Sequence, residues 1–158
     1  MNALEWSADE AAWTTTLSNT VFDDLVIRVM TDGDTCAPSP IQLQAVAEIE
    51  RLTMADLSPI DDLARKYASA RLDPDELYNM DDDDFAVEIY CAHVPRLRDS
   101  NDTYVLFGAN SEIDPEHGLG CICKNGKLLA VIPADYVYEN LDWDSTSQLD
   151  TLVNVRQY

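Results

Sequence analysis

Basic side chains are scarce in this sequence, and their scarcity limits the partners that the protein can have. Ten lysines and arginines stand against 30 aspartates and glutamates, so the 158 residues carry a formal net charge of −20 at pH 7. Such a charge repels the phosphate backbone of nucleic acids and the anionic face of a membrane. We therefore expect no nucleic-acid and no membrane partner. The excess of acids favours either a basic protein partner or a surface that maintains solubility.

Long apolar runs are absent as well. No stretch approaches the roughly 20 apolar residues of a membrane span, and residues 1–10 hold neither the basic nor the apolar run of a signal peptide. We therefore expect a cytoplasmic protein with reduced cysteines. Hydrophobic residues still make up 46% of the chain, which is ordinary for a folded protein. We expect one globular domain over residues 1–158, with the acidic termini at its periphery.

Glycine is scarce too, which bears on catalysis. Three of the five glycines (Gly118, Gly120 and Gly126) fall in one hairpin region. No glycine-rich loop remains that could cradle a phosphate, and the dinucleotide fingerprint is missing. A nucleophile motif such as Gly-x-Ser-x-Gly is missing as well. The sequence thus argues against a nucleotide-using enzyme, and we expect no cofactor.

The first half of the chain predicts two strands followed by two helices. Residues 11–17 and 25–30 are rich in the β-branched and aromatic residues that strands prefer. Ser39-Pro40-Ile41-Gln42 has the composition of an N-cap, a first-turn proline and a capping-box partner. Ser58-Pro59-Ile60-Asp61 repeats this pattern, with an acid in the last position. Residues 40–70 are therefore expected to form a helical pair.

The second half predicts four further strands. Apolar and other residues alternate over residues 85–91, with the period of a half-buried strand. Three more strand-like runs cover residues 104–109, 119–124 and 127–132, and residues 134–141 are expected to form a short helix. The fold class is therefore α+β: a mainly antiparallel sheet of about five to six strands, with the helical pair packed on one face.

One hairpin is specified in detail. Asn125-Gly126 lies between the last two strand-like runs, and this dipeptide is the strongest short-range hairpin signal. A two-residue loop places Lys124 opposite Lys127. The same register places Ile122 opposite Leu129.

An acidic connection follows the helical pair. Residues 73–84 contain seven acids and no basic residue. We expect these acids to contact a basic partner, with a solvated turn as the alternative. A calcium loop is not expected, because the spaced Asp-x-Asp-x-Asp-Gly pattern with its closing glutamate is missing. The candidate contact residues are Asp73, Asp75, Glu76, Asp81, Asp82, Asp83 and Asp84.

A second candidate site is the segment Asp114-Pro115-Glu116-His117-Gly118. It brings two carboxylates and an imidazole close together in sequence, which a general-base or metal-dependent enzyme could use. The alternative is a tight turn, in which proline presets the second position and glycine takes a positive φ. No second histidine stands nearby in sequence, so we expect no metal site here.

The cysteines allow a further interpretation. Cys121 and Cys123 lie on one face of a predicted strand, and Cys91 with His93 on a neighbouring strand would complete a set of soft-metal ligands. The spacing differs from the Cys-x₂-Cys that wraps zinc. We therefore expect these thiols to be part of the core, where a free cysteine acts as a small hydrophobe.

These features together resemble a known group of proteins. A strand pair, the run Pro-Ser-Pro-Ile-Gln-Leu-Gln-Ala that opens a helix at residues 38–45, and the run Asp-Pro-Glu-His-Gly-Leu-Gly at residues 114–120 occur in the order found in uncharacterised bacterial cytoplasmic domains. Those domains are grouped with immunity proteins of polymorphic-toxin systems. The resemblance covers roughly residues 10–133, and its most specific part is residues 114–127. It implies a binding function and supplies no catalytic residues.

Three hypotheses about function follow. The first is a small acidic cytoplasmic binding protein of the immunity type, which masks a basic protein partner. The second is a metal-dependent or acid/base enzyme centred on Asp114, Glu116 and His117. The third is an interaction module of another process. The charge, the missing catalytic motifs and the resemblance favour the first, and leave the oligomeric state open.

Overall fold

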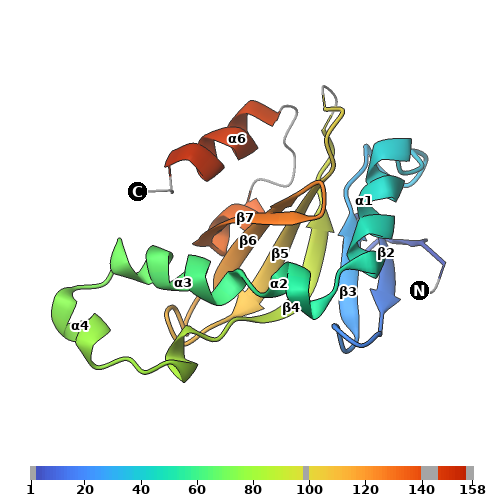
Figure 1. The fold of residues 1–158 in the computed structure, drawn as a ribbon. Helices are drawn as coiled ribbons and strands as arrows, with labels where there is room; N and C mark the ends of the chain where they lie inside the picture. The colour runs from blue at the N-terminus through green and yellow to red at the C-terminus, as the bar shows by residue number, and fades with distance from the viewer. Residues whose placement is uncertain (1–2, 98–99, 140–145, 156–158) are drawn as a thin grey trace.

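The computed structural model describes the backbone of residues 3–97, 100–139 and 146–155 (Figure 1). A seven-stranded sheet lies at its centre, and the strands follow one another in chain order across it. Every neighbouring pair is antiparallel except β3 and β4, which are parallel. The strands are β1 (Glu5–Ser7), β2 (Ala12–Leu17), β3 (Leu25–Val29), β4 (Glu88–Val94), β5 (Tyr104–Asn110), β6 (Leu119–Lys124) and β7 (Lys127–Pro133).

The predicted α+β class and mainly antiparallel sheet are confirmed, but the sheet has more strands than expected. The additional strand is β1, which is only three residues long and pairs with β2 at the edge of the sheet. Trp6 on β1 contacts Trp13 on β2 edge to face, with ring centroids 6.2 Å apart. This aromatic contact adds to the three-residue pairing that holds β1 to β2.

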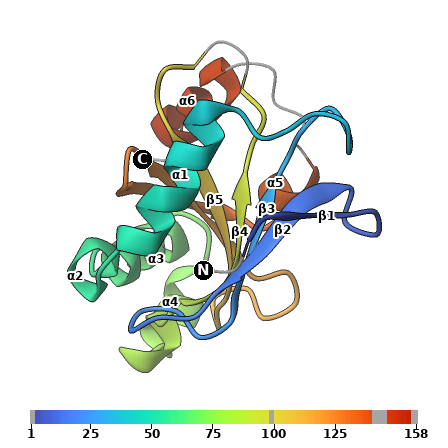
Figure 2. The same ribbon diagram turned by 90° about the vertical axis from the view of Figure 1, so that its right-hand side faces the viewer.

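The parallel pair β3 and β4 requires a crossover, and the helices supply it. α1 (Pro40–Arg51), α2 (Met54–Leu57), α3 (Ile60–Ser69), α4 (Pro74–Tyr78) and the 3₁₀ turn η1 (Asp83–Phe85) all lie between the two strands in sequence. α1, α2 and α3 lie on one side of the sheet (Figure 2). Their buried side chains form the helix-side core, which includes Val46, Ile49 and Ala64 against Ile27 and Phe107.

The first predicted helix start and its cap are confirmed, whereas the second helix begins at Ile60, next to the predicted Pro59, without the predicted cap at Ser58. The Ser39 hydroxyl accepts a hydrogen bond from the Gln42 amide at 3.3 Å, and the Gln42 side chain accepts one from the Ser39 amide at 3.0 Å. Ser58, in contrast, ends α2, and its hydroxyl donates to the Ala55 carbonyl at 2.9 Å. Thr53 caps α2 five residues earlier, so α3 begins after Pro59 without a side-chain cap.

The strand predicted over residues 85–91 lies three residues further along the chain, since β4 runs from Glu88 to Val94. Phe85 belongs to η1, because the Ala86 amide donates to the Asp83 carbonyl at 3.0 Å and closes a turn there. The Phe85 ring is buried, and the Arg65 guanidinium lies 4.3 Å from its centroid. β4 therefore begins at Glu88, where pairing with β5 starts.

The predicted hairpin is confirmed, with one error of register. Lys124 pairs with Lys127 across a turn in which Asn125 (φ +50°) and Gly126 (φ +72°) both have a positive φ. Ile122, however, pairs with Ala130 rather than with Leu129. A β-bulge next to Ile122 sets two residues of β7 against one of β6, and this shifts the register.

The other face of the sheet carries its own core. α5 (Asp135–Glu139) and α6 (Thr146–Val155) cover it, and the far-side core includes Leu106, Ile122 and Ile132 with Val137 and Leu149. α5 corresponds to the helix predicted over residues 134–141, of which residues 140 and 141 lie outside the described part of the chain.

The three cysteines of the strands are divided between the two faces of the sheet, and Cys36 is exposed outside them. Cys121 and Cys123 belong to the helix-side core, as predicted. Ala92 pairs with Phe107 on that same face, so Cys91 and His93, its sequence neighbours, face the opposite side. The soft-metal set of four therefore does not come together.

Candidate functional site

Three of the candidate partner-binding acids serve to start a helix. Asp73 caps α4: its carboxylate accepts hydrogen bonds from the Asp75 and Glu76 amides, both at 2.9 Å. Glu76 completes the box by accepting from the Asp73 amide at 3.0 Å. The connection over residues 73–84 therefore contains a short helix, α4, that was not predicted. Asp-Pro-Asp-Glu is itself a capping pattern and could have revealed α4.

The four consecutive aspartates fold back on themselves. The Asp84 carboxylate accepts from the Asp81 amide at 2.8 Å, and the Asp81 carboxylate accepts from the Asp83 amide at 2.9 Å. Asp82 forms an ion pair with Arg65 at 2.9 Å, and its side chain is 93% exposed. These hydrogen bonds direct the carboxylates differently, and Asp81, Asp82 and Asp83 remain at the surface.

The Asp114–Gly118 segment is the tight turn that its composition predicts. The Asp114 carboxylate accepts from the His117 amide at 3.1 Å and lies 3.2 Å from His117 Nδ1. The Gly118 amide donates to the Asp114 carbonyl at 2.7 Å, and Gly118 has a φ of +75°. A Cβ at Gly118 would stand 2.5 Å from the Ala109 carbonyl oxygen. Glycine is therefore required, while Glu116 and His117 remain exposed.

The structure brings Asp83, at the end of the acidic run, and the start of β4 to the same place as this turn, which the sequence does not indicate. β4 and β5 pair antiparallel with Glu88 opposite Asn110, so the start of β4 lies beside the end of β5. A hollow of about 750 Å³ opens there, which we call the acidic hollow. Its polar and charged lining residues are Asp83, Glu88, Tyr90, Asn110, Ser111, Glu112, Asp114, Glu116 and His117.

The charge of the acidic hollow is one-sided. Five of its lining side chains are carboxylates, and among the described lining residues none is lysine or arginine. His117 is the one imidazole in this lining, and its side chain is 60% exposed. Carboxylates that face a hollow without a cation attract cationic groups from solution. Of the residues predicted to contact a basic partner, only Asp83 lines this hollow, and Glu88 and Glu112 were not predicted.

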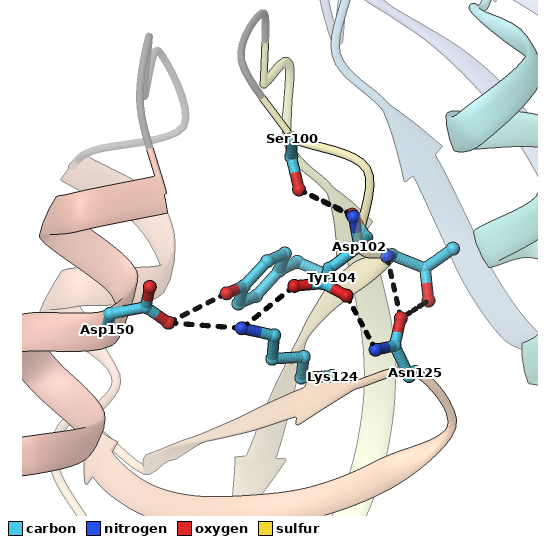
Figure 3. Close-up of polar contacts among 7 residues, drawn as sticks. Ser100, Asp102, Tyr104, Lys124, Asn125 and Asp150 are labelled. Atoms are coloured by element: carbon cyan, nitrogen blue, oxygen red, sulfur yellow. Dashed lines mark hydrogen bonds and ion pairs between the residues drawn. The ribbon is translucent and has the colours of Figure 1, made fainter.

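A second polar cluster lies near the hairpin turn at the other end of the sheet, and there a cation lies between two of the acids. Lys124 Nζ lies 3.0 Å from an Asp102 carboxylate oxygen and 3.4 Å from one of Asp150, between the two (Figure 3). The Tyr104 hydroxyl donates to Asp150 at 2.8 Å. Hydrogen bonds from Asn125 and Lys124 lower the pKa of Asp102. This cluster fastens α6 to the sheet.

The buried thiols and the buried histidine are poor candidates for chemistry. Burial raises the pKa of Cys121 and of Cys123 to about 12, so neither is a ready thiolate. His93 lies 3.5 Å from the Cys91 sulfur, and burial, together with Arg28, lowers its pKa to about 4. Among the residues that the structure describes, no three histidine, cysteine or acidic side chains gather in an arrangement that could hold a metal ion.

Comparison with known proteins identifies a family. Residues 2–138 match a family described as a domain of unknown function (DUF6985), and the chain belongs to that family. Neither a curated protein nor a solved structure matches the chain. The matched region contains every residue of the acidic hollow, whereas α6 lies beyond it. Within the described part of the chain, no helix has both the length and the apolar character needed to cross a membrane.

Proposed function

We propose that this member of the family is a small cytoplasmic binding protein that masks a basic protein partner, as an immunity protein does. The observation that carries the proposal is the acidic hollow: five carboxylates line it, and no lysine or arginine appears among its described lining residues. The resemblance to domains grouped with immunity proteins supports the same class. The chain's net charge of −20 extends the attraction well beyond the hollow itself.

The physical consequence is electrostatic steering. A negative hollow on a negative protein raises the local concentration of a cationic partner and accelerates encounter. The effect weakens with salt, since the screening length is about 10 Å at 0.1 M ionic strength. Binding at the hollow therefore depends on salt mainly through the association rate.

Another candidate function rests on one contact. Asp114 holds the His117 imidazole at 3.2 Å beside the exposed Glu116, which is a carboxylate–imidazole pair on the wall of a hollow. Such a pair could act as a general base in an enzyme. A hydrolytic activity of the purified protein that disappears in His117→Ala and is unaffected by removal of the neighbouring charge in Glu112→Gln would favour this candidate over binding.

The proposed function is tested by partner capture with matched baits. One bait is the wild-type chain, and the second, the hollow triple variant, carries Asp83→Asn, Glu88→Gln and Glu116→Gln. The third, the control triple variant, carries Glu5→Gln, Asp9→Asn and Asp34→Asn, three exposed acids away from the hollow. Both triple variants change the net charge equally.

We expect the wild-type and control baits to retain the same basic protein from host lysate, identified by mass spectrometry and then purified. The hollow triple variant should bind the purified protein with a lower association rate. Equal binding by the two triple variants would contradict the proposal, because it would make the attraction a property of net charge alone.

A further inference from the structure

A second hollow, of about 500 Å³, lies directly beside the acidic one, and we call it the apolar notch. Residues 86–88 line both hollows and form the wall between them. On the far side of this wall the notch is bounded by the β2–β3 turn, by α2 and by the start of α3. Its apolar lining residues are Val21, Phe22, Met54, Leu57, Ile60, Ala86, Val87 and Ile89.

The walls of the notch are held in place by local hydrogen bonds. In the β2–β3 turn, the Asn19 side chain accepts from the Val21 and Phe22 amides, both at 2.8 Å. The Phe22 ring stacks on Phe107 of the sheet, with centroids 6.2 Å apart. A notch with such fixed walls loses little conformational entropy when a ligand fills it.

The opposite wall exposes an adaptable side chain. α2 is one turn long and is held by reciprocal hydrogen bonds between Thr53 and Asp56. Met54, at its first position, is 66% exposed, the most exposed aliphatic side chain among the large hydrophobic residues of the described chain. Methionine is flexible and polarizable, and it is common on surfaces that bind other proteins.

The notch also has a charge, and the charge indicates what fills it. Its ionisable lining residues are Asp23, Asp61 and Glu88, and none of the described lining residues is basic. Glu88 belongs to both hollows. An apolar group that enters the notch is therefore surrounded by carboxylates, which favour a ligand with cationic groups beside the apolar one.

We infer that the acidic hollow and the apolar notch form one docking surface, whose occupant is a short basic segment of a partner protein. This segment places a cationic side chain in the hollow and an apolar side chain in the notch, on either side of residues 86–88. The inference rests on the proposed function and specifies the partner's chemistry. Desolvated apolar anchors commonly supply most of the affinity of an interface, while charges supply the encounter rate.

The test uses two synthetic peptides and the full-length chain. Both are acetylated decapeptides with four lysines separated by glycines, and one of them carries a phenylalanine in place of a glycine between the second and the third lysine. Binding is followed by backbone amide shifts in NMR titrations of the isotope-labelled protein. The variant Met54→Gln probes the notch. Leu43→Gln is its control, because Leu43 is also exposed (47%) but lies on α1, outside the notch.

We expect both peptides to shift amides of the acidic hollow, and only the phenylalanine peptide to shift those of Val21, Met54 and Val87. The phenylalanine should tighten binding about tenfold, which is about half of the free energy gained by fully burying its side chain. Met54→Gln should remove most of this gain, and Leu43→Gln should leave it unchanged.

The outcomes separate this inference from the function on which it rests. If the two peptides bind equally at the acidic hollow, or if the phenylalanine shifts residues elsewhere, the notch is not part of the docking surface, but the hollow still binds cations. If neither peptide shifts the amides of the hollow, both the inference and the proposed function fail.

Discussion

The carboxylates around Lys124 and those of the acidic hollow have opposite surroundings. Asp102 and Asp150 share the Lys124 ammonium and accept further hydrogen bonds from Asn125 and Tyr104. In the acidic hollow, five carboxylates face one imidazole. Paired acids stabilise a fold, whereas acids that repel one another cost stability. The first region therefore holds the protein together, and the second has the charge pattern of a binding surface.

The two histidines show the same contrast. His93 lies on β4 with 3% of its surface exposed, opposite Leu106 and beside the Arg28–Glu10 ion pair. His117 lies on the exposed turn of the hollow. Burial ties the charge state of His93 to folding, whereas the exposed ring of His117 is accessible to a ligand.

The largest expected effect concerns His93 and pH. Its pKa is about 4 in the folded protein and about 6.5 when unfolded, so the folded state disfavours the charged ring. The stability that His93 contributes is complete above pH 6.5 and is lost as the pH falls toward 4. This loss amounts to about 3 kcal/mol, at 1.36 kcal/mol for each pKa unit. When urea unfolding is compared at pH 7 and pH 4, the wild type should show this loss of stability from His93, and His93→Gln should not.

Leu106→Val is the control for this measurement. It removes one methylene group beside His93 and should cost about 1 kcal/mol at both pH values. If His93→Gln loses as much stability between pH 7 and pH 4 as the wild type does, the buried ring is not the group that titrates.

The next largest effect concerns Lys124. Lys124→Met keeps most of the apolar stem but removes the cation between Asp102 and Asp150, and we expect a loss of about 1–2 kcal/mol. Its cross-strand neighbour Lys127 is exposed, so Lys127→Met should change stability by less than about 0.5 kcal/mol. Chemical denaturation of both variants measures the two losses of stability. Equal losses would show that the Lys124 cluster does not stabilise the fold.

Gly126→Val and His117→Ala together compare how much the hairpin turn and the hollow contribute to stability. A β-branched residue resists the positive φ of this turn position, so the variant should lose about 1–2 kcal/mol. His117→Ala truncates an exposed ring and should change stability by less than about 0.5 kcal/mol. Thermal midpoints measured side by side test the difference. A larger decrease for His117→Ala would mean that its contact with Asp114 supports the fold.

The smallest effect is expected in the hollow itself. The hollow triple variant should be as stable as the wild type or slightly more stable, because it relieves repulsion among the carboxylates. Its free energy of unfolding, measured with denaturant, should rise by at most about 0.5 kcal/mol. The control triple variant reports the contribution of net charge alone. A clear destabilisation specific to the hollow triple variant would remove the contrast between the two regions.

Features that depend on neighbouring residues could be predicted from the sequence. The capping box at Ser39 and the turn at Asn125-Gly126 each form within a few residues, and both were predicted correctly. Prediction failed where alternatives compete or where distant contacts decide. Ser58 has a cap-like sequence, but Thr53 starts a helix first. The bulge beside Ile122 changes a register that the turn alone would leave regular.

The candidate site was predictable only in parts. The acidity of residues 73–84 and the turn at Asp114 are visible in the sequence. Their meeting is not, because it depends on the pairing of β4 with β5, which brings Asp83 and Glu88 to the end of β5. No pattern in the sequence marked Glu112 as a residue of this site. The apolar notch joins three distant segments and was missed entirely.

The association rate of the captured basic partner tests the central claim most directly. It should be measured by stopped flow at about 0.05 M and 0.3 M salt, for the wild type and for both triple variants. We predict that the wild-type rate falls steeply with salt, and that at low salt the hollow triple variant is slower than the control triple variant. A rate that is indifferent to salt, or equal in the two triple variants, would contradict the assignment of the acidic hollow as the binding surface.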